Sequence, residues 1–187
     1  MLKILIAEDD GISIPNETSA NVNQSLFAEG KADEPVPQKT IIFGCNELTK
    51  QIITELDCYV PAGSEIIVAT TEENFSEEFI PTQEELNKLK LTKEICNIFD
   101  RNELEKIVSV NPNNILILTN QEDDDETADS KTLLLLLQLR DITRKNTYHF
   151  TITSEIRSVD NQELAEVTKV TDFVISRNIT ALMTPHT

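Results

Sequence analysis

The sequence is poor in cysteine. Its three cysteines, Cys45, Cys58 and Cys96, lie far apart, and no two of them form a Cys-x-x-Cys pair. Disulfide frameworks use an even number of cysteines at regular spacing, and thiolate zinc sites use such pairs. The sequence therefore indicates neither kind of site, and it favours a reducing compartment.

Basic side chains are also scarce. The chain has 16 Lys and Arg against 33 Asp and Glu, which gives a formal net charge of -17. Because nucleic-acid binding needs a local excess of Lys and Arg, we expect no nucleic-acid partner and no anionic lipid partner. A surface this acidic keeps a protein in solution and attracts cations and basic protein faces.

Long hydrophobic runs are missing as well. The apolar stretch near the start, 2–7, is followed at once by Glu8, Asp9 and Asp10. It is too short for the core of a signal peptide, and far short of the roughly 20 apolar residues that cross a bilayer. The sequence therefore predicts no membrane-spanning segment within these residues.

The residues that are present point first to the stretch 40–56. A short apolar strand over 40–43 leads into a turn at Gly44, and an amphipathic helix follows. The apolar positions of this helix are Leu48, Ile52, Ile53 and Leu56. Strand, glycine turn and amphipathic helix in this order are typical of the start of a Rossmann-type sheet.

Apolar segments and helical patterns alternate along the rest of the chain. Further strands are expected at 65–69, 95–99, 115–118, about 150–152 and 173–175. Helices are expected after the capping-box sequence 82–85, which carries Leu86 and Leu89, after 100–103, over about 129–145, and around 164–170. Six strands alternating with helices predict an α/β fold, a doubly wound parallel sheet of Rossmann type.

The composition changes between 15 and 38. This stretch is rich in Asn, Ser, Glu, Ala and Pro and closes on Pro35-Val36-Pro37, which favours extended backbone. We therefore divide the chain into an N-terminal strand and linker, 1–39, and a Rossmann-like domain, 40–187.

Short stretches spread along the chain carry a family resemblance. They are 5–10, 60–65, 115–118 with 129–130, 139–142, 152–156 and 170–176. In this order and spacing they resemble the cytosolic regulatory part of the CASTOR/POLLUX ion-channel family, whose RCK/TrkA-N-like domains belong to the class that regulates potassium conductance. The resemblance covers nearly all of the chain except the linker and about 70–94.

This resemblance implies a regulatory domain of a potassium or calcium channel, gated by ligand binding and subunit rearrangement. It implies a homo-oligomer, a dimer or a higher ring, attached to the membrane pore domain of the same protein and lying on the cytoplasmic face. Residues 1–39 would end a preceding regulatory lobe, and the pore helices would precede Met1.

The first turn is a candidate nucleotide site. It keeps one glycine, Gly44, of the G-x-G-x-x-G fingerprint. Asn46 stands near a position of the fingerprint that needs a small residue, and the Glu47 carboxylate at the start of the helix would repel phosphate. Glu72 follows the second strand, where dinucleotide sites carry a ribose-binding acid. Gly44, Asn46 and Glu72 are the candidate residues. A purely structural turn is the favoured interpretation, and the alternative function is an NAD-dependent oxidoreductase or nucleotide-binding protein with a degenerate fingerprint.

The acidic run after the fourth strand is a candidate metal site. Its carboxylates are Asp123, Asp124, Asp125, Glu126 and Asp129. They follow the carboxyl end of a central strand and could supply oxygen ligands to calcium, although the spacing matches no EF-hand. The alternative is a solvated loop whose last acids favour the helix N-terminus. The candidate cofactors are thus calcium or a nucleotide.

The long helix carries five consecutive leucines, 133–137. A helix apolar nearly all round must be covered on more than one side, so we predict a helix of another subunit against it. The predicted interface residues are Leu133, Leu136, Leu137 and Arg140. Asp141, Glu155 and Arg157 fit either subunit contacts or internal salt bridges.

No catalytic residues are predicted. His149 and His186 have no carboxylate or nucleophile motif nearby in sequence, and Ser154 lacks a nucleophile-elbow context. The sequence therefore predicts a protein that is not an enzyme.

Overall fold

The computed structural model describes residues 6–8, 11–13, 36–146, 148–158 and 172–175. The chain divides into two units, Met1–Glu34 and Pro35–Thr187. In the first, β1 (Ile6–Glu8) pairs antiparallel with β2 (Gly11–Ser13). The sequence predicted the first of these strands without a partner, and Gly11 was assigned to a turn. The partner strand begins at this glycine.

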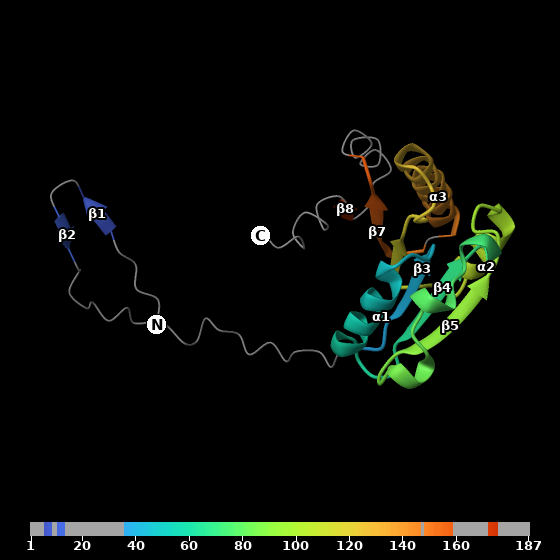
Figure 1. Cartoon of the computed structure of the whole chain (residues 1–187), viewed down its shortest axis with the longest axis horizontal. Helices are drawn as coiled ribbons and strands as arrows, with labels where there is room; N and C mark the ends of the chain where they lie inside the picture. The colour runs from blue at the N-terminus through green and yellow to red at the C-terminus, as the bar shows by residue number, and fades with distance from the viewer. Residues whose placement is uncertain (1–5, 9–10, 14–35, 147, 159–171, 176–187) are drawn as a thin grey trace. The chain divides into compact units, whose positions relative to one another are not determined.

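The second unit is built on a six-stranded parallel sheet (Figure 1). Its order is β5-β4-β3-β6-β7-β8, with every neighbouring pair parallel. The strands are β3 (Lys39–Phe43), β4 (Glu65–Thr70), β5 (Lys90–Ile95), β6 (Asn114–Ile117), β7 (Thr151–Ile156) and β8 (Asp172–Ile175). The predicted fold class is confirmed. The strand order reverses between β3 and β6, and this point is where open α/β sheets bind ligands.

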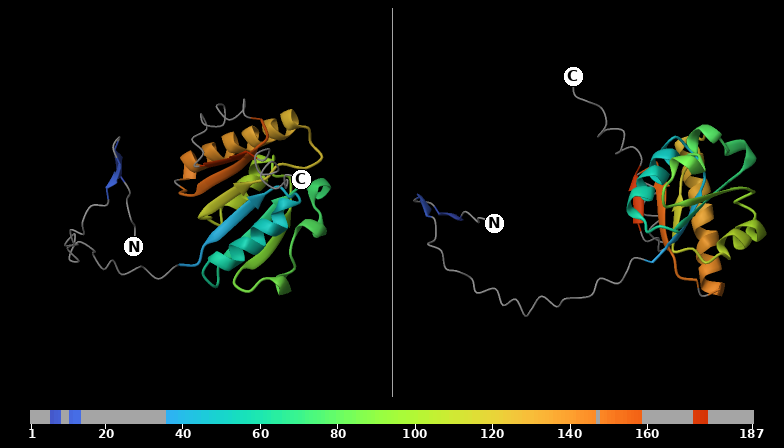
Figure 2. Two further views of the ribbon diagram at one scale, coloured as in Figure 1. Left: turned by 60° about the vertical axis from the view of Figure 1, so that its left-hand side comes forward. Right: turned by 90° about the horizontal axis from the view of Figure 1, so that it is seen from below.

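Helices cover both faces of the sheet (Figure 2). One face carries α1 (Leu48–Tyr59) and the short turns η3 (Glu77–Phe79) and η4 (Gln83–Glu85). The short turn η2 (Glu72–Asn74) follows the carboxyl end of β4. The other face carries α2 (Arg101–Val108) and α3 (Asp125–Asn146). None of the helices in the described ranges is both long and apolar enough to span a membrane.

The two faces give two hydrophobic clusters. In β3, Ile41 and Phe43 pack toward α2 and α3, whereas Ile42 packs toward α1. All three are fully buried. This two-sided burial is why the central strands are apolar at successive positions.

The third strand of the domain differs from the prediction. It is β5, at 90–95, and not 95–99. Its sequence, KLTKEI, is mostly polar because β5 is an edge strand, so it lacks the apolar run of the central strands. Ile98 is buried in the turn before α2.

The helix predicted around Leu86 and Leu89 is also absent. Only η4 forms there, and both leucines are buried in the α1-side cluster. The cap itself is present, because the Thr82 N–H donates to the Glu85 carboxylate at 2.7 Å. The predicted cap of α2 is confirmed, since Asp100 accepts from the N–H groups of Asn102 and Glu103.

Candidate functional site

The carboxyl ends of the central strands bring together residues from three separate segments. Gly44 and Asn46 lie in the turn between β3 and α1, Thr119 follows β6, and Glu155 belongs to β7. The last three side chains are buried, at 4%, 3% and 6% exposure. This cluster occupies the crevice at the point of strand reversal.

Gly44 is required by a close approach of two backbones. Its φ is +88°, and a Cβ at this position would lie 2.2 Å from the carbonyl oxygen of Leu118, just beyond β6. Its own N–H donates to the carbonyl of Ala69 at 3.0 Å. The glycine therefore serves the packing of strand ends, which agrees with the structural interpretation of the turn.

Asn46 uses its whole side-chain amide inside the domain. Its Nδ2 donates to the Thr119 carbonyl at 2.9 Å and to the Glu155 carboxylate at 3.1 Å. Its Oδ1 accepts from the Leu48 N–H at 3.0 Å. The backbone N–H of Asn46 donates to the Thr49 hydroxyl at 2.9 Å. Two N–H groups at the start of α1, which in dinucleotide sites face the pyrophosphate, are thus already bonded.

Glu155 places a carboxylate of the protein itself in this crevice. Besides the Asn46 amide, it accepts from the Thr119 N–H at 2.9 Å. The cavity that remains beside Gly44 has a volume of about 30 Å³. This is about the space that one water occupies in the liquid. The buried side chains of Asn46 and Glu155 occupy this crevice, and the Glu155 carboxylate would repel a pyrophosphate.

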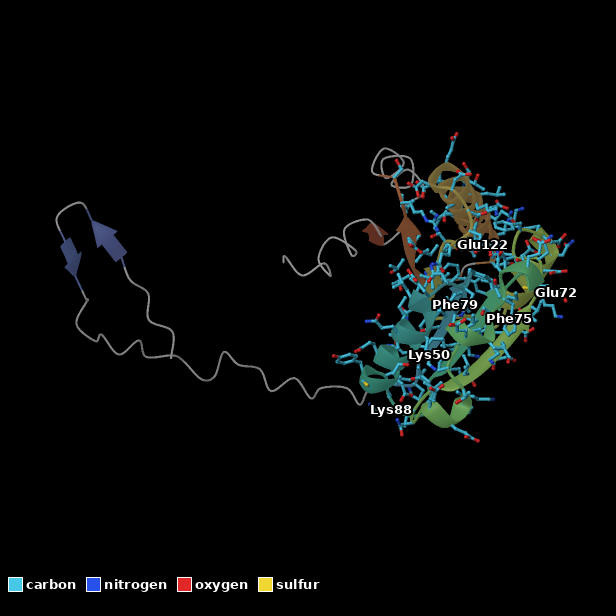
Figure 3. The ribbon with its side chains drawn as sticks, in the orientation of Figure 1. Lys50, Glu72, Phe75, Phe79, Lys88 and Glu122 are labelled. Carbon is cyan, nitrogen blue, oxygen red and sulfur yellow. The ribbon has the colours of Figure 1, made fainter. Side chains whose placement is uncertain are left out.

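Glu72 lies elsewhere. It is an exposed residue at the start of η2 and lines a larger groove with residues of β5 and α2 (Figure 3). The small cavity beside Gly44 does not include it. The structure therefore separates this candidate ribose-binding acid from Gly44 and Asn46.

The predicted metal site is not assembled. Among the residues that the structure describes, no group of three or more His, Cys, Asp or Glu side chains could hold a metal ion. Asp123 pairs with Lys131 at 2.8 Å, and the exposed Glu126 lies in the first turn of α3. Asp125 lies 3.9 Å from the Arg157 guanidinium. The physical reason is that α3 begins at 125, four residues earlier than predicted, so the carboxylates are spread around a helix start.

Two of these acids have clear structural roles. Asp124 accepts from the backbone N–H and the hydroxyl of Thr127, and these bonds hold the pKa of Asp124 below its ordinary value. Asp129 is fully buried and accepts from the N–H groups of Arg157 and Ser158 at 2.8 and 2.9 Å. The helix-start interpretation of the run agrees with this geometry.

Arg157 fastens the loop between β6 and α3. Its Nε donates to the Thr119 hydroxyl at 3.1 Å, and its Nη2 donates to the Asn120 carbonyl at 2.6 Å. Asp141 pairs with Arg101 and Lys145 at 2.8 and 2.9 Å. Asp141, Glu155 and Arg157 were expected to make either subunit contacts or internal salt bridges. The bonds seen here lie within the domain, so they fit the second interpretation.

The leucines of α3 face in two directions. Leu135 and Leu136 are 1% exposed and belong to the core, whereas Leu134 and Leu137 are 48% and 53% exposed. Leu133 packs partly against the core, and Arg140 is half-buried. Leu136 is therefore unavailable to a partner, and the apolar surface of α3 is the pair Leu134 and Leu137.

The residues considered for catalysis lie in different environments. The Ser154 hydroxyl is buried and has no hydrogen-bond partner within the described residues, and His149 is exposed. His186 lies outside the described residues.

No protein-family model matches the chain, and no curated protein matches it in sequence. Several solved structures share its fold. The RCK domain of GsuK matches with a TM-score of 0.53 and 16% identity, over 75% of this chain and 26% of that one. The same protein has been solved bound to ADP and, as a channel, bound to NAD. This chain thus spans about a quarter of the GsuK chain.

Two single domains match over almost their whole length. The NAD(P)-binding domain of an exopolyphosphatase-related protein from Archaeoglobus fulgidus matches with a TM-score of 0.53 and 16% identity, over 78% of this chain and 92% of that one. The TrkA-N domain of the inner membrane protein ybaL from Escherichia coli matches with a TM-score of 0.51 and 11% identity, over 80% and 98%. The likeness is one of fold. It includes RCK and TrkA-N domains among the structures that share this sheet.

Proposed function

We propose that this chain is a regulatory domain of the RCK/TrkA-N type in a CASTOR/POLLUX-like cation channel, acting by binding and conformational change and not by catalysis. The observation that carries the proposal is the fold match, which extends over nearly the whole TrkA-N domain of ybaL. The ordered sequence resemblance supports the choice of channel family, with potassium or calcium as the permeant ion.

The domain works in this proposal as part of a homo-oligomer on the cytoplasmic face of a membrane, joined to the pore domain of the same full-length protein. The exposed pair Leu134 and Leu137 supports the assembly, because adjacent large apolar side chains in water favour a protein contact. A ligand that binds one arrangement of subunits more tightly than another would then shift the pore.

The test starts from the open reading frame that contains this chain. The proposal expects pore helices on the same frame, and cation currents when the full-length protein is expressed in a cell. Replacing both Leu134 and Leu137 by Glu should change the gating of these currents while leaving the amount of protein at the membrane unchanged. A frame without membrane helices would overturn the proposal.

Nucleotide binding is the second candidate, because GsuK has been solved with ADP and NAD and the Archaeoglobus fulgidus domain is NAD(P)-binding. The crevice argues against nucleotide binding, because Asn46, Thr119 and Glu155 fill it. Isothermal titration with NAD, NADH, ATP and calcium separates the two. We expect no tight nucleotide binding. Tight NADH binding with turnover of a substrate would replace the regulatory proposal by an oxidoreductase.

A further inference from the structure

A groove lies away from the strand reversal, between the edge strand β5 and α2. Its volume is about 590 Å³. Pockets of about 300 to 1,000 Å³ are the usual size of binding sites. Glu72, which Figure 3 labels near the tip of β5, lies on its rim.

The groove is lined by apolar side chains from both elements and from β4. They are Ile67, Ile95, Ile107 and Val110. Ile95 is 53% exposed and Val110 is 37% exposed, although both are large and apolar. Exposed apolar side chains at the edge of a sheet form a surface that gains by being covered.

The polar lining is acidic. Glu72, Glu94 and Glu103 face a single lysine, Lys106, among the lining residues. Glu103 is fixed in place because it accepts from the Asn97 N–H. Lys93 cannot balance these charges from within the groove, because its ammonium lies over the Phe75 ring, 5.9 Å from the centroid, on the α1 side of the sheet. An occupant with positive charge complements this rim.

The backbone of β5 is open beside the groove. The N–H of Lys90 donates to the carbonyl of Ser64, just before β4, and the N–H of Cys96 donates to the carbonyl of Thr70, the last residue of β4. By strand alternation, the N–H groups of residues 91, 93 and 95 point away from β4. The Gln83 side chain covers the first of these positions, accepting from the Leu91 N–H at 2.8 Å. At 93 and 95 no hydrogen bond to the described residues covers the edge. An added strand could pair there.

We propose that this groove binds an extended segment of a partner protein that carries alternating apolar and basic residues. The segment pairs with β5 at Lys93 and Ile95. Because successive side chains of a strand point to opposite faces of the sheet, its Lys or Arg residues lie on the α2 side against the three glutamates, and its apolar residues lie on the other face beside Ile95. This site is independent of the proposed channel function.

The first experiment uses a labelled synthetic peptide of alternating leucine and lysine, and measures its binding by fluorescence anisotropy. Two controls have the same length, one with serine for leucine and one with glutamate for lysine. We expect both controls to bind at least about tenfold more weakly. Equal binding of the serine control would overturn the proposal, since the net charge of -17 attracts any polycation.

The second experiment determines where on the domain the peptide binds. Burial, with Glu103 and Glu94 nearby, raises the pKa of the Cys96 thiol, which lines the groove, to about 11. Cys58 on α1 is exposed and serves as the reference in the same molecule. With the peptide bound, alkylation of Cys96, followed by mass spectrometry, should slow while that of Cys58 stays unchanged. An unchanged alkylation rate at Cys96 would show that the peptide does not bind in this groove.

Variants complete the test. Ile95→Lys should weaken peptide binding about tenfold, whereas Tyr59→Lys, at an 82% exposed residue of α1, should leave it unchanged. A peptide N-methylated at alternate residues should also lose binding, because it cannot pair with a strand edge. If Tyr59→Lys weakens binding as much as Ile95→Lys, or the methylated peptide binds as well as the parent, the proposal fails.

Discussion

At the scale of single residues, two glycines with nearly equal φ angles differ in what surrounds them. Gly44 has φ +88° and Gly63 has φ +86°. A Cβ at Gly44 would lie 2.2 Å from a backbone oxygen, whereas at Gly63 the nearest atom is the Pro37 Cγ at 3.8 Å. Substituting alanine at each of the two glycines therefore separates two free-energy costs, that of the left-handed backbone angle and that of the close backbone approach.

Gly63→Ala should lower the free energy of unfolding by about 1 kcal/mol, the cost of a left-handed backbone in a residue with a Cβ. Gly44→Ala should lower it by at least about 3 kcal/mol, because strand ends must also move apart. Urea denaturation of both variants measures the difference. Equal losses would show that the contact with Leu118 relaxes freely.

Glu155 provides the second prediction at this scale. Glu155→Ala removes the acceptor of the Thr119 N–H and one acceptor of the Asn46 amide, and should cost about 1 to 3 kcal/mol of stability. Sodium formate should restore part of the melting temperature of this variant, because a small carboxylate can take the vacated place. Glu155→Gln, which keeps an acceptor oxygen, should respond less to formate. A variant as stable as the wild type would contradict this role.

At the scale of elements, Asp57 ties the end of α1 to the segment before β5. It is 5% exposed and accepts from the N–H groups of Asn87, Lys88 and Leu89 at 2.9, 2.8 and 2.8 Å. Burial acts to raise the pKa of Asp57, but the hydrogen bonds together outweigh it and hold the pKa below the ordinary value. Its stabilisation is therefore present above the unfolded-state pKa and is lost as the pH falls through the folded-state value.

Asp57→Asn should be about 2 kcal/mol less stable than the wild type near neutral pH. The difference should shrink as the pH falls below about 4, the ordinary pKa of an aspartate, because the unfolded state then binds a proton that the folded carboxylate takes up only at lower pH. Urea denaturation across this pH range checks both statements, with Glu55→Gln on the exposed side of α1 as the matched control. If the stability difference between Asp57→Asn and the wild type does not change with pH, the charged form of Asp57 is not the source of the stabilisation.

At the scale of the whole molecule, the unpaired leucines of α3 predict self-association. The double variant Leu134→Glu with Leu137→Glu should be monomeric in sedimentation velocity at concentrations where the wild type associates. Its stability should change by no more than about 0.5 kcal/mol, because both side chains lie at the surface. Tyr59→Glu, at an 82% exposed residue of α1, is the control. A wild type that stays monomeric at high concentration would contradict the prediction.

The central strands were predictable from sequence because burial on both faces leaves an apolar run, as in β3 and β6. The edge strand β5 was placed wrongly, since its exposed residues carry no such signal and the buried Ile98 lies just beyond it. The start of α3 was set four residues too late because the cap is Asp124, inside a run of acids in which sequence distinguishes no member.

The sequence by itself determined the alternation of strands and helices around the central strands and the loss of the glycine fingerprint, because both depend on neighbours along the chain. Only the tertiary structure decided what fills the crevice instead. Asn46 and Glu155 are 109 residues apart and meet because the order of the sheet brings β7 close to β3 across β6. That order follows from packing over the whole domain, so no local pattern could have assigned the partner.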